Sequence, residues 1–168
     1  ISILSKLECS EGREDSLMDF VSQLLKKNPD EMVMTFTHLI SNISDRIFNH
    51  LSPVFNGRIT RIDGRVAKSI DERITRAEAF SMALYQASVN GIDAIGEAFP
   101  MPTYDRNCSV LFLQPPLTPG HDDQAIGRVF RYGQKGEVNV YYILAVSDRL
   151  AERMLNFKER WESENKRQ

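Results

Sequence analysis

The fold is decided by residues 109–144, which read SVLFLQPPLTPGHDDQAIGRVFRYGQKGEVNVYYIL. This stretch opens on one short apolar run, 109–113, and closes on another, 138–144. Short apolar runs bounded by turn residues are typical of strands buried on both faces. Between them, a loop rich in proline and glycine leads into a short predicted helix. A strand, a helix and a strand in this order predict a right-handed crossover between two parallel strands.

The same alternation extends toward the N-terminus. Further strands are predicted at 31–36 and at 58–62, where Asp63-Gly64 forms a closing turn. Another is expected over 81–85, although glycines and prolines interrupt the pattern from there to 106. Asp15 or Ser16 is expected to cap the first helix, and Asn28-Pro29 to end it. Helical spacing marks three apolar faces: Leu17, Phe20, Val21, Leu24 and Leu25; Ile40, Ile43, Ile47 and Leu51, ending near Ser52-Pro53; and Ile70, Ile74, Ala77 and Phe80.

Strands that alternate with helices predict a three-layer α/β fold, with a mostly parallel sheet covered by helices on both faces. Ligands bind such folds at the carboxyl edge of the sheet. The 168 residues fit one domain, 1–168, with an irregular lead-in over 1–13. A C-terminal helix is expected over 148–168, with one face formed by Leu150, Met154, Phe157 and Trp161.

Composition narrows the classes of function. The formal net charge of −2 gives no overall attraction for nucleic acid, so any such contact must come from a local cluster. Cys9 and Cys108 have no disulfide or zinc-site spacing, which favours free thiols in a reducing, intracellular compartment. No apolar run is long enough to cross a bilayer, so no membrane partner is expected. The first residue is Ile, and we expect a piece of a longer protein.

Two arginines, Arg128 and Arg131, carry the candidate chemistry. On a helix their spacing would place both guanidinium groups on one face, about one turn apart. A guanidinium donates two parallel hydrogen bonds to phosphate oxygens and keeps its charge. Gly127 and Gly133 would allow a close backbone approach or a tight turn. The spacing alone is weak evidence, because most such pairs are solvated helix faces.

The whole string from Gln124 to Gln134 is more specific. It resembles the last helicase motif of the Swi/Snf family, which reads close to QAIGRxHRIGQ and is followed by VxVYxL. Weaker resemblances are the strand 33–38, the 110–116 stretch, and Asp63-Gly64 with Arg73 and Phe80 downstream. Together they cover roughly residues 31–145.

The resemblance implies the C-terminal, second RecA-like lobe of a superfamily 2 DNA-dependent ATPase, a fold of the P-loop NTPase type. Arg128 and Arg131 would be catalytic, and Gln124 and Gly127 would join them in binding nucleotide. Thr37 and His38 would lie at the DNA. The expected partners are an N-terminal lobe of the same protein and duplex DNA, free or in chromatin. The expected setting is nuclear, in chromatin remodelling or DNA repair.

ATP and Mg²⁺ are expected only in the full-length protein. The sequence has neither a Gly-rich loop ending in Gly-Lys-Ser/Thr nor an acidic magnesium motif. We therefore expect no cofactor, no metal and no ATPase activity for this chain alone, and an ATP hydrolase as the parent.

Departures from the family pattern leave a second hypothesis open. Phe130 stands where the family has His, and Tyr132 where it has Ile. Residues 99–104 replace a Gly-rich segment ending in GxNL that contacts DNA and couples it to hydrolysis in the family. The alternative is a degenerate, non-catalytic lobe that serves as a scaffold for DNA or protein. A free-standing small-molecule enzyme is poorly supported, because no nucleophile–base pair stands out.

Overall fold

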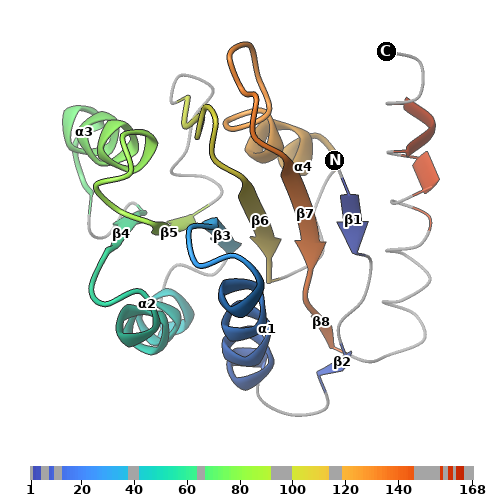
Figure 1. The fold of residues 1–168 in the computed structure, drawn as a ribbon, viewed down its shortest axis with the longest axis horizontal. Coiled ribbons are helices and arrows are strands. Elements are labelled where there is room, and N and C mark those ends of the chain that lie inside the picture. Colours follow the sequence, from blue (N-terminus) through green and yellow to red (C-terminus); the bar gives the residue numbers. More distant parts are fainter. Residues whose placement is uncertain are drawn as a thin grey trace.

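A parallel sheet forms the centre of the computed structural model, which describes residues 2–4, 8–9, 13–37, 42–63, 67–91, 100–113, 119–145, 156, 159–160 and 162–164. Six strands lie in the order β1-β7-β6-β3-β5-β4, and every pairing is parallel (Figure 1). Their bounds are β1 Ser2–Leu4, β3 Met32–Thr37, β4 Ile59–Ile62, β5 Ala87–Gly91, β6 Cys108–Phe112 and β7 Val138–Tyr142. A separate parallel pair joins β2 (Glu8–Cys9) to β8 (Leu144–Ala145). The predicted neighbours 32–36, 109–113 and 138–144 are confirmed as β3, β6 and β7.

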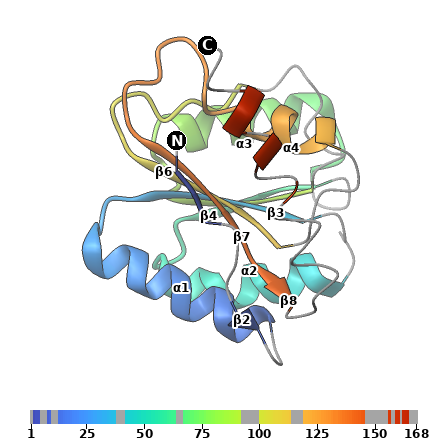
Figure 2. The same ribbon diagram turned by 90° about the vertical axis from the view of Figure 1, so that its right-hand side faces the viewer.

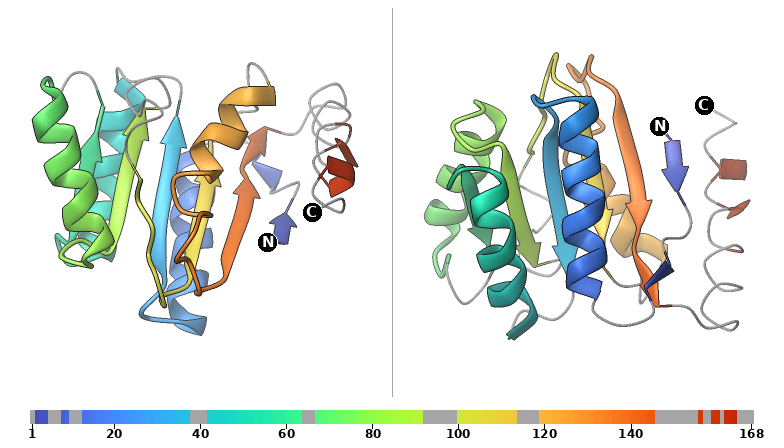
Figure 3. Two further views of the ribbon diagram at one scale, coloured as in Figure 1. Left: turned by 90° about the horizontal axis from the view of Figure 1, so that it is seen from above. Right: turned by 60° about the horizontal axis from the view of Figure 1, so that its bottom comes forward.

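Helices cover both faces of the sheet, as the alternation predicts. Figure 2 shows α1 (Arg13–Lys27) and α2 (Asn42–Val54) on one face, and α3 (Ile70–Ser81) and α4 (Pro119–Ile126) on the other. The views in Figure 3 show the same three layers, with β1 beside β7 at one side of the sheet. The three-layer α/β fold class is therefore confirmed.

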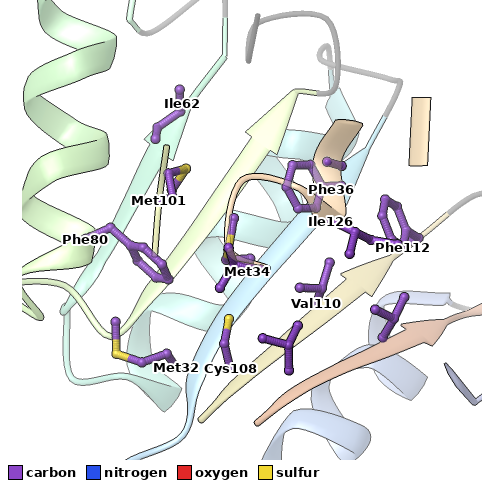
Figure 4. Packing of buried hydrophobic residues seen from close by; sticks show 14 of the residues in the cluster. Met32, Met34, Phe36, Ile62, Phe80, Met101, Cys108, Val110, Phe112 and Ile126 are labelled. Carbon is purple, nitrogen blue, oxygen red and sulfur yellow. The ribbon is translucent and has the colours of Figure 1, made fainter. Parts of the chain in front are cut away.

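Each face of the sheet packs into its own apolar core. Successive residues of a strand point to opposite faces, so Met32, Met34 and Phe36 enter one core while Val33 enters the other. The first core lies toward α3 and α4 and includes Phe80 and Ile126 (Figure 4). Its rings stack across three strands, with centroids 5.4 Å apart for Phe36–Phe112 and 5.1 Å apart for Phe112–Tyr142. The second core packs against the first two helices with Leu17, Val21, Ile47 and Leu51.

Local sequence explains several element ends. Ser69 caps α3, because its hydroxyl oxygen accepts a hydrogen bond from the Glu72 amide at 3.1 Å. The first helix ends at Lys27, directly before Asn28-Pro29, as predicted. None of the helices in the described part of the chain combines the length and apolar character needed to cross a bilayer.

Several expectations about individual elements are wrong. Asp15 and Ser16 do not cap the first helix, because α1 begins at Arg13. Residues 81–85 end α3 and turn, and the strand follows as β5. The lead-in over 1–13 contains the short strands β1 and β2.

The second helix ends at Val54, near Ser52-Pro53 as expected. The third helix differs in detail, because Ile70 is 62% exposed at the start of α3 instead of joining its apolar face. Ile40 lies outside the described residues. So does most of the expected helix over 148–168, of which residues 156, 159–160 and 162–164 are described as helical.

Candidate functional site

The two motif arginines lie beyond the helix that was expected to carry them. The fourth helix ends at Ile126, and the chain then passes through a series of turns before β7 begins at Val138. We call residues 127–137 the arginine loop. Its turns are closed by backbone bonds from Arg128 N to Ala125 O at 3.2 Å and from Gln134 N to Arg131 O at 3.0 Å. The expectation of one shared helix face for both guanidinium groups is therefore wrong.

The two arginines also differ in exposure. Arg128 is buried, with 4% of its surface exposed, whereas Arg131 is exposed. Arg128 takes part in polar or electrostatic interactions within the fold. Its burial contradicts the expectation that both side chains lie at an exposed edge. A buried guanidinium needs partners to offset its desolvation, so Arg128 is part of the interior that supports the loop.

A second segment runs alongside the arginine loop. Residues 100–107, the facing segment, precede β6 and include part of the stretch that replaces the family's Gly-rich sequence. Its Met101 N donates to Arg128 O at 2.8 Å, and Tyr104 O accepts from the amides of Lys135 at 2.9 Å and Gly136 at 2.7 Å. Met101 and Thr103 are fully buried. The facing segment is therefore buried over residues 101–103 and joined to the arginine loop by backbone hydrogen bonds at Met101 and Tyr104.

One side chain, that of Gln134, joins the two segments most extensively. Its Oε1 accepts from the amides of Thr103 at 2.8 Å and Tyr104 at 3.0 Å. Its Nε2 donates to Thr103 Oγ1 at 2.8 Å, and to the carbonyl oxygens of Arg106 and Gly136 at 3.3 Å each. In the sequence Gln134 is only the last residue of the motif, and no sequence pattern indicates this role.

Two glycines shape the loop for different reasons. Gly133 has φ of +92°, a conformation that strains residues with a side chain. Gly136 has a close backbone neighbour: an added Cβ would lie 1.9 Å from Arg106 O. The expectation of a tight turn fits Gly133. The closest backbone approach is at Gly136, which no sequence pattern indicated.

The other predicted site residues are spread over different elements. Gln124 is exposed on α4, and Gly127 is the first residue after that helix. Thr37 is fully buried at the carboxyl end of β3, and His38 lies outside the described residues. Gln124, Gly127 and the two arginines thus belong to one continuous segment. Thr37 lies at the carboxyl edge of the sheet, whereas the arginine loop returns toward the amino end of β7.

The weaker motif at Asp63 forms a buried charge cluster. Arg61 donates from Nε at 3.1 Å and from Nη2 at 2.8 Å to Asp63 Oδ2, and from Nη1 to Asp45 Oδ1 at 2.6 Å. Arg73 Nε donates to Ala67 O at 2.8 Å, and Ala67 N donates to Asp63 O at 2.9 Å. Phe80 is fully buried. This motif therefore stabilises the fold. The role of Arg61 in it was not predicted from the sequence.

A polar network lies at the opposite, amino edge of the sheet. Ser109 donates from its hydroxyl to buried Glu31 Oε1 at 2.8 Å, and Asn28 Nδ2 donates to Glu31 Oε2 at 2.9 Å. Burial, and next the charge of Glu31, raise the pKa of the Cys108 thiol far above its usual range. Cys108 is thus a buried, unreactive thiol. Among the described residues no cluster of three or more His, Cys, Asp or Glu side chains could hold a metal.

Two known proteins are similar to this chain in sequence. The chain is 31% identical over 139 residues to DNA excision repair protein ERCC-6-like of Bos taurus, covering 78% of this chain and 10% of that protein. It is 30% identical over 153 residues to DNA annealing helicase and endonuclease ZRANB3 of Mus musculus, covering 88% of this chain and 13% of that protein. The chain thus spans about a tenth of the length of these relatives. No protein-family model matches it.

Solved structures show the same architecture. The C-terminal part of the Fun30 ATPase domain superposes with a TM-score of 0.71 at 20% identity, over 88% of this chain and 45% of that one. The Pyrococcus furiosus Hef helicase domain superposes with a TM-score of 0.61 at 18% identity, over 88% of this chain and 28% of that one. At these identities the likeness is one of fold.

Proposed function

The chain belongs to the Swi/Snf-type superfamily 2 family as a C-terminal RecA-like lobe, and from this premise we propose that it is the second motor lobe of a DNA-dependent ATPase. A preceding lobe of the same protein would hold ATP and Mg²⁺. Arg131 would reach the phosphates across the cleft when the lobes close. The observation that carries the proposal is an exposed arginine on a loop that hydrogen bonds hold to the fold.

Such an arginine suits phosphoryl transfer. Charge develops on the phosphate oxygens in the transition state, and a guanidinium held in place stabilises it without reorganising. The backbone of Arg131 is bonded from both sides, since its N donates to Val129 O at 3.0 Å and its O accepts from Gln134 N. Its side chain is exposed and can meet a ligand that arrives on a second lobe.

The two arginines have different roles in this proposal. Arg131 is the finger, whereas Arg128 supports the loop from inside, because only 4% of its surface is exposed. Gln124 and Gly127 precede them on the same segment and would complete the nucleotide contacts of this lobe. Thr37, at the carboxyl end of β3, and His38, the next residue in the sequence, would lie on the DNA side.

The names of the relatives support a DNA-acting parent. One is named a DNA excision repair protein and the other a DNA annealing helicase and endonuclease. We therefore propose duplex DNA as the partner of the full-length protein and the nucleus as its location, with repair or chromatin remodelling as its setting. Closing and opening of the two lobes would move the protein along DNA.

The test is DNA-stimulated ATP hydrolysis by the full-length protein. We expect Arg131→Ala to lower kcat on the order of 10³-fold or more, as for other arginine fingers, with little change in ATP binding. Arg131→Lys should restore little activity, because an ammonium cannot make two parallel hydrogen bonds.

Arg128→Ala should lower both kcat and the thermal midpoint, because it leaves a cavity in the interior. Arg46→Ala removes an exposed arginine from α2, on the other face of the sheet, and should leave kcat unchanged. Equal rates for the unmutated protein and Arg131→Ala would refute the finger.

One observation favours the scaffold alternative. The facing segment includes part of the stretch that replaces the family's Gly-rich, DNA-contacting sequence. Its Met101 and Thr103 are buried, and Tyr104 is hydrogen-bonded to the arginine loop. Residues 101–103 therefore offer no exposed side chain to DNA, whereas residues 104–107 are exposed. An unmutated full-length protein that binds duplex DNA but hydrolyses no ATP would establish the scaffold and exclude the motor.

A further inference from the structure

The Gln134 amide uses nearly all of its hydrogen-bonding capacity. A primary amide offers two acceptor lone pairs and two donor hydrogens. Both lone pairs are used by consecutive backbone amides, those of Thr103 and Tyr104. The NH₂ group meets three oxygens, at Thr103 Oγ1, Arg106 O and Gly136 O. No smaller or differently charged side chain could make this set of bonds.

The surrounding backbone is shaped to receive this amide. Tyr104 has φ of +54°, an uncommon value for a residue other than glycine, and its carbonyl accepts from two consecutive amides of the arginine loop. Gly136 approaches Arg106 so closely that no side chain fits. Glu137 N also donates to Asn107 Oδ1 at 2.9 Å. The two segments are therefore joined by both backbone and side-chain bonds, and Gln134 lies between them.

The same residue closes the turn that carries Arg131. Gln134 N donates to Arg131 O at 3.0 Å, three residues back along the chain. Its backbone thus holds the finger's turn while its side chain holds the facing segment. Arg131 itself is exposed, so its placement depends on the backbone beneath it and not on packing of its own side chain. A displacement of about 1 Å in a catalytic group can cost about a hundredfold in rate.

We propose that Gln134 is a positioning residue for Arg131, and this inference rests on the proposed motor function. Its amide fixes the arginine loop to the facing segment, so that Arg131 enters the cleft at a set place and angle. Gln134 touches neither ATP nor DNA in this role and acts only through Arg131. The facing segment, which includes part of the stretch that replaces the family's Gly-rich sequence, thereby becomes the support of the catalytic loop.

The chemistry separates two substitutions. Gln134→Ala removes every side-chain bond. Gln134→Glu keeps nearly the same size and can still accept from Thr103 N and Tyr104 N. It loses the NH₂ donors, however, and sets a negative charge against the oxygens of Thr103, Arg106 and Gly136. Both variants should therefore loosen the loop, the second without leaving a cavity.

The experiment measures kcat and KM for ATP in the full-length protein at saturating duplex DNA. We expect Gln134→Ala and Gln134→Glu to lower kcat about tenfold to a hundredfold while KM stays within about twofold. The decisive variant combines Gln134→Ala with Arg131→Ala. If Gln134 acts through Arg131, the double variant is no slower than Arg131→Ala alone, because effects of residues that act as a unit do not add.

Gln86→Ala is the matched control. Its Nε2 donates to Pro29 O at 2.7 Å and to Glu31 O at 3.0 Å, so it also joins two segments through an amide. These partners precede β3 and do not belong to the arginine loop. We expect Gln86→Ala to lower the thermal midpoint and to leave kcat unchanged. If Gln134→Ala does not fold, Thr103→Val takes its place, because it removes one acceptor of the Gln134 NH₂ group.

The outcomes distinguish the inference from the function on which it rests. A slow Arg131→Ala variant beside normal Gln134 variants overturns the inference alone. Losses in kcat that multiply in the double variant also overturn it, because Gln134 would then act independently of Arg131. If Arg131→Ala is as fast as the unmutated protein, or if that protein hydrolyses no ATP, the proposed function fails and this inference fails with it.

Discussion

Replacing Asp63 by asparagine tests the charge cluster at the end of β4. Asp63 Oδ2 accepts two hydrogen bonds from Arg61, and the two side chains are only 1% and 11% exposed. Arg61 also meets the Asp45 carboxylate at 2.6 Å and lies 5.7 Å from the ring centroid of Phe48. Asp63→Asn keeps the shape of the side chain but removes the more deeply buried of the two carboxylate charges beside the Arg61 guanidinium.

The expected loss follows from these exposures. Breaking a buried ion pair by removing one partner costs about 3–5 kcal/mol, because the other charge stays buried. Asp45, whose side chain is 40% exposed, remains beside Arg61. We therefore expect Asp63→Asn to lower the free energy of unfolding by about 3 kcal/mol, the lower end of that range. The Arg76–Glu72 pair has the same 2.8 Å separation but side-chain exposures of 28% and 42%. Glu72→Gln should therefore cost only about 0.3–0.5 kcal/mol.

The assay is equilibrium unfolding in urea, followed by circular dichroism, for the unmutated chain and both variants. The slopes should stay equal, and the midpoint of Asp63→Asn should fall several times further than that of Glu72→Gln. Equal, small losses in the two variants would refute the reasoning, because burial would then not set the strength of the pair. A changed slope would mean that the variant altered the denatured state or left two-state behaviour.

Two other substitutions probe the packing behind the candidate site. Gly136→Ala places a methyl group 1.9 Å from Arg106 O and should lower the urea midpoint much more than Gly133→Ala does. The Cβ added at Gly133 meets nothing within 4 Å, so that variant costs only the strain of a positive φ, about 1 kcal/mol. Equal losses in the two variants would contradict this reasoning. Burial raises the pKa of Cys108, so its thiol stays neutral in the folded chain and ionises on unfolding above its ordinary value of 9.0. That contribution to stability is complete below pH 9 and falls by about 1.4 kcal/mol per pH unit above it. Urea unfolding at pH 8 to 10 in a reducing buffer should thus show a shallower decline for Cys108→Ala than for the unmutated chain, and parallel declines would exclude this cause.

The sequence by itself determined the layers of the fold and the identity of the family. The runs at β3, β6 and β7 are apolar enough to be recognised as buried strands, because each must fill both faces of a parallel sheet. The string from Gln124 to Gln134 carried the family resemblance, because its residue types and order follow a helicase motif except at Phe130 and Tyr132. Both inferences rest on residues within each segment and do not depend on which other segments pack against it.

What the sequence missed depended on neighbours distant in the chain. The fifth strand reads Ala-Ser-Val-Asn-Gly, a poor strand pattern, and it is buried because β3 and β4 flank it. Its Asn90 can be buried because Nδ2 donates to Thr35 O and to Ser88 Oγ. Most buried polar groups have a hydrogen-bond partner, and the Thr35 carbonyl that Asn90 meets belongs to another element, β3.

The same holds at the candidate site. Helical spacing placed Arg128 and Arg131 on one face, but the helix stops at Ile126, and the amide of Met101 meets the carbonyl of Arg128. The sequence determined which residues carry the positive charge. Only the tertiary structure decided that one of them is buried, that the other is exposed, and that Gln134 holds their loop, because burial and hydrogen bonding depend on segments that meet through folding.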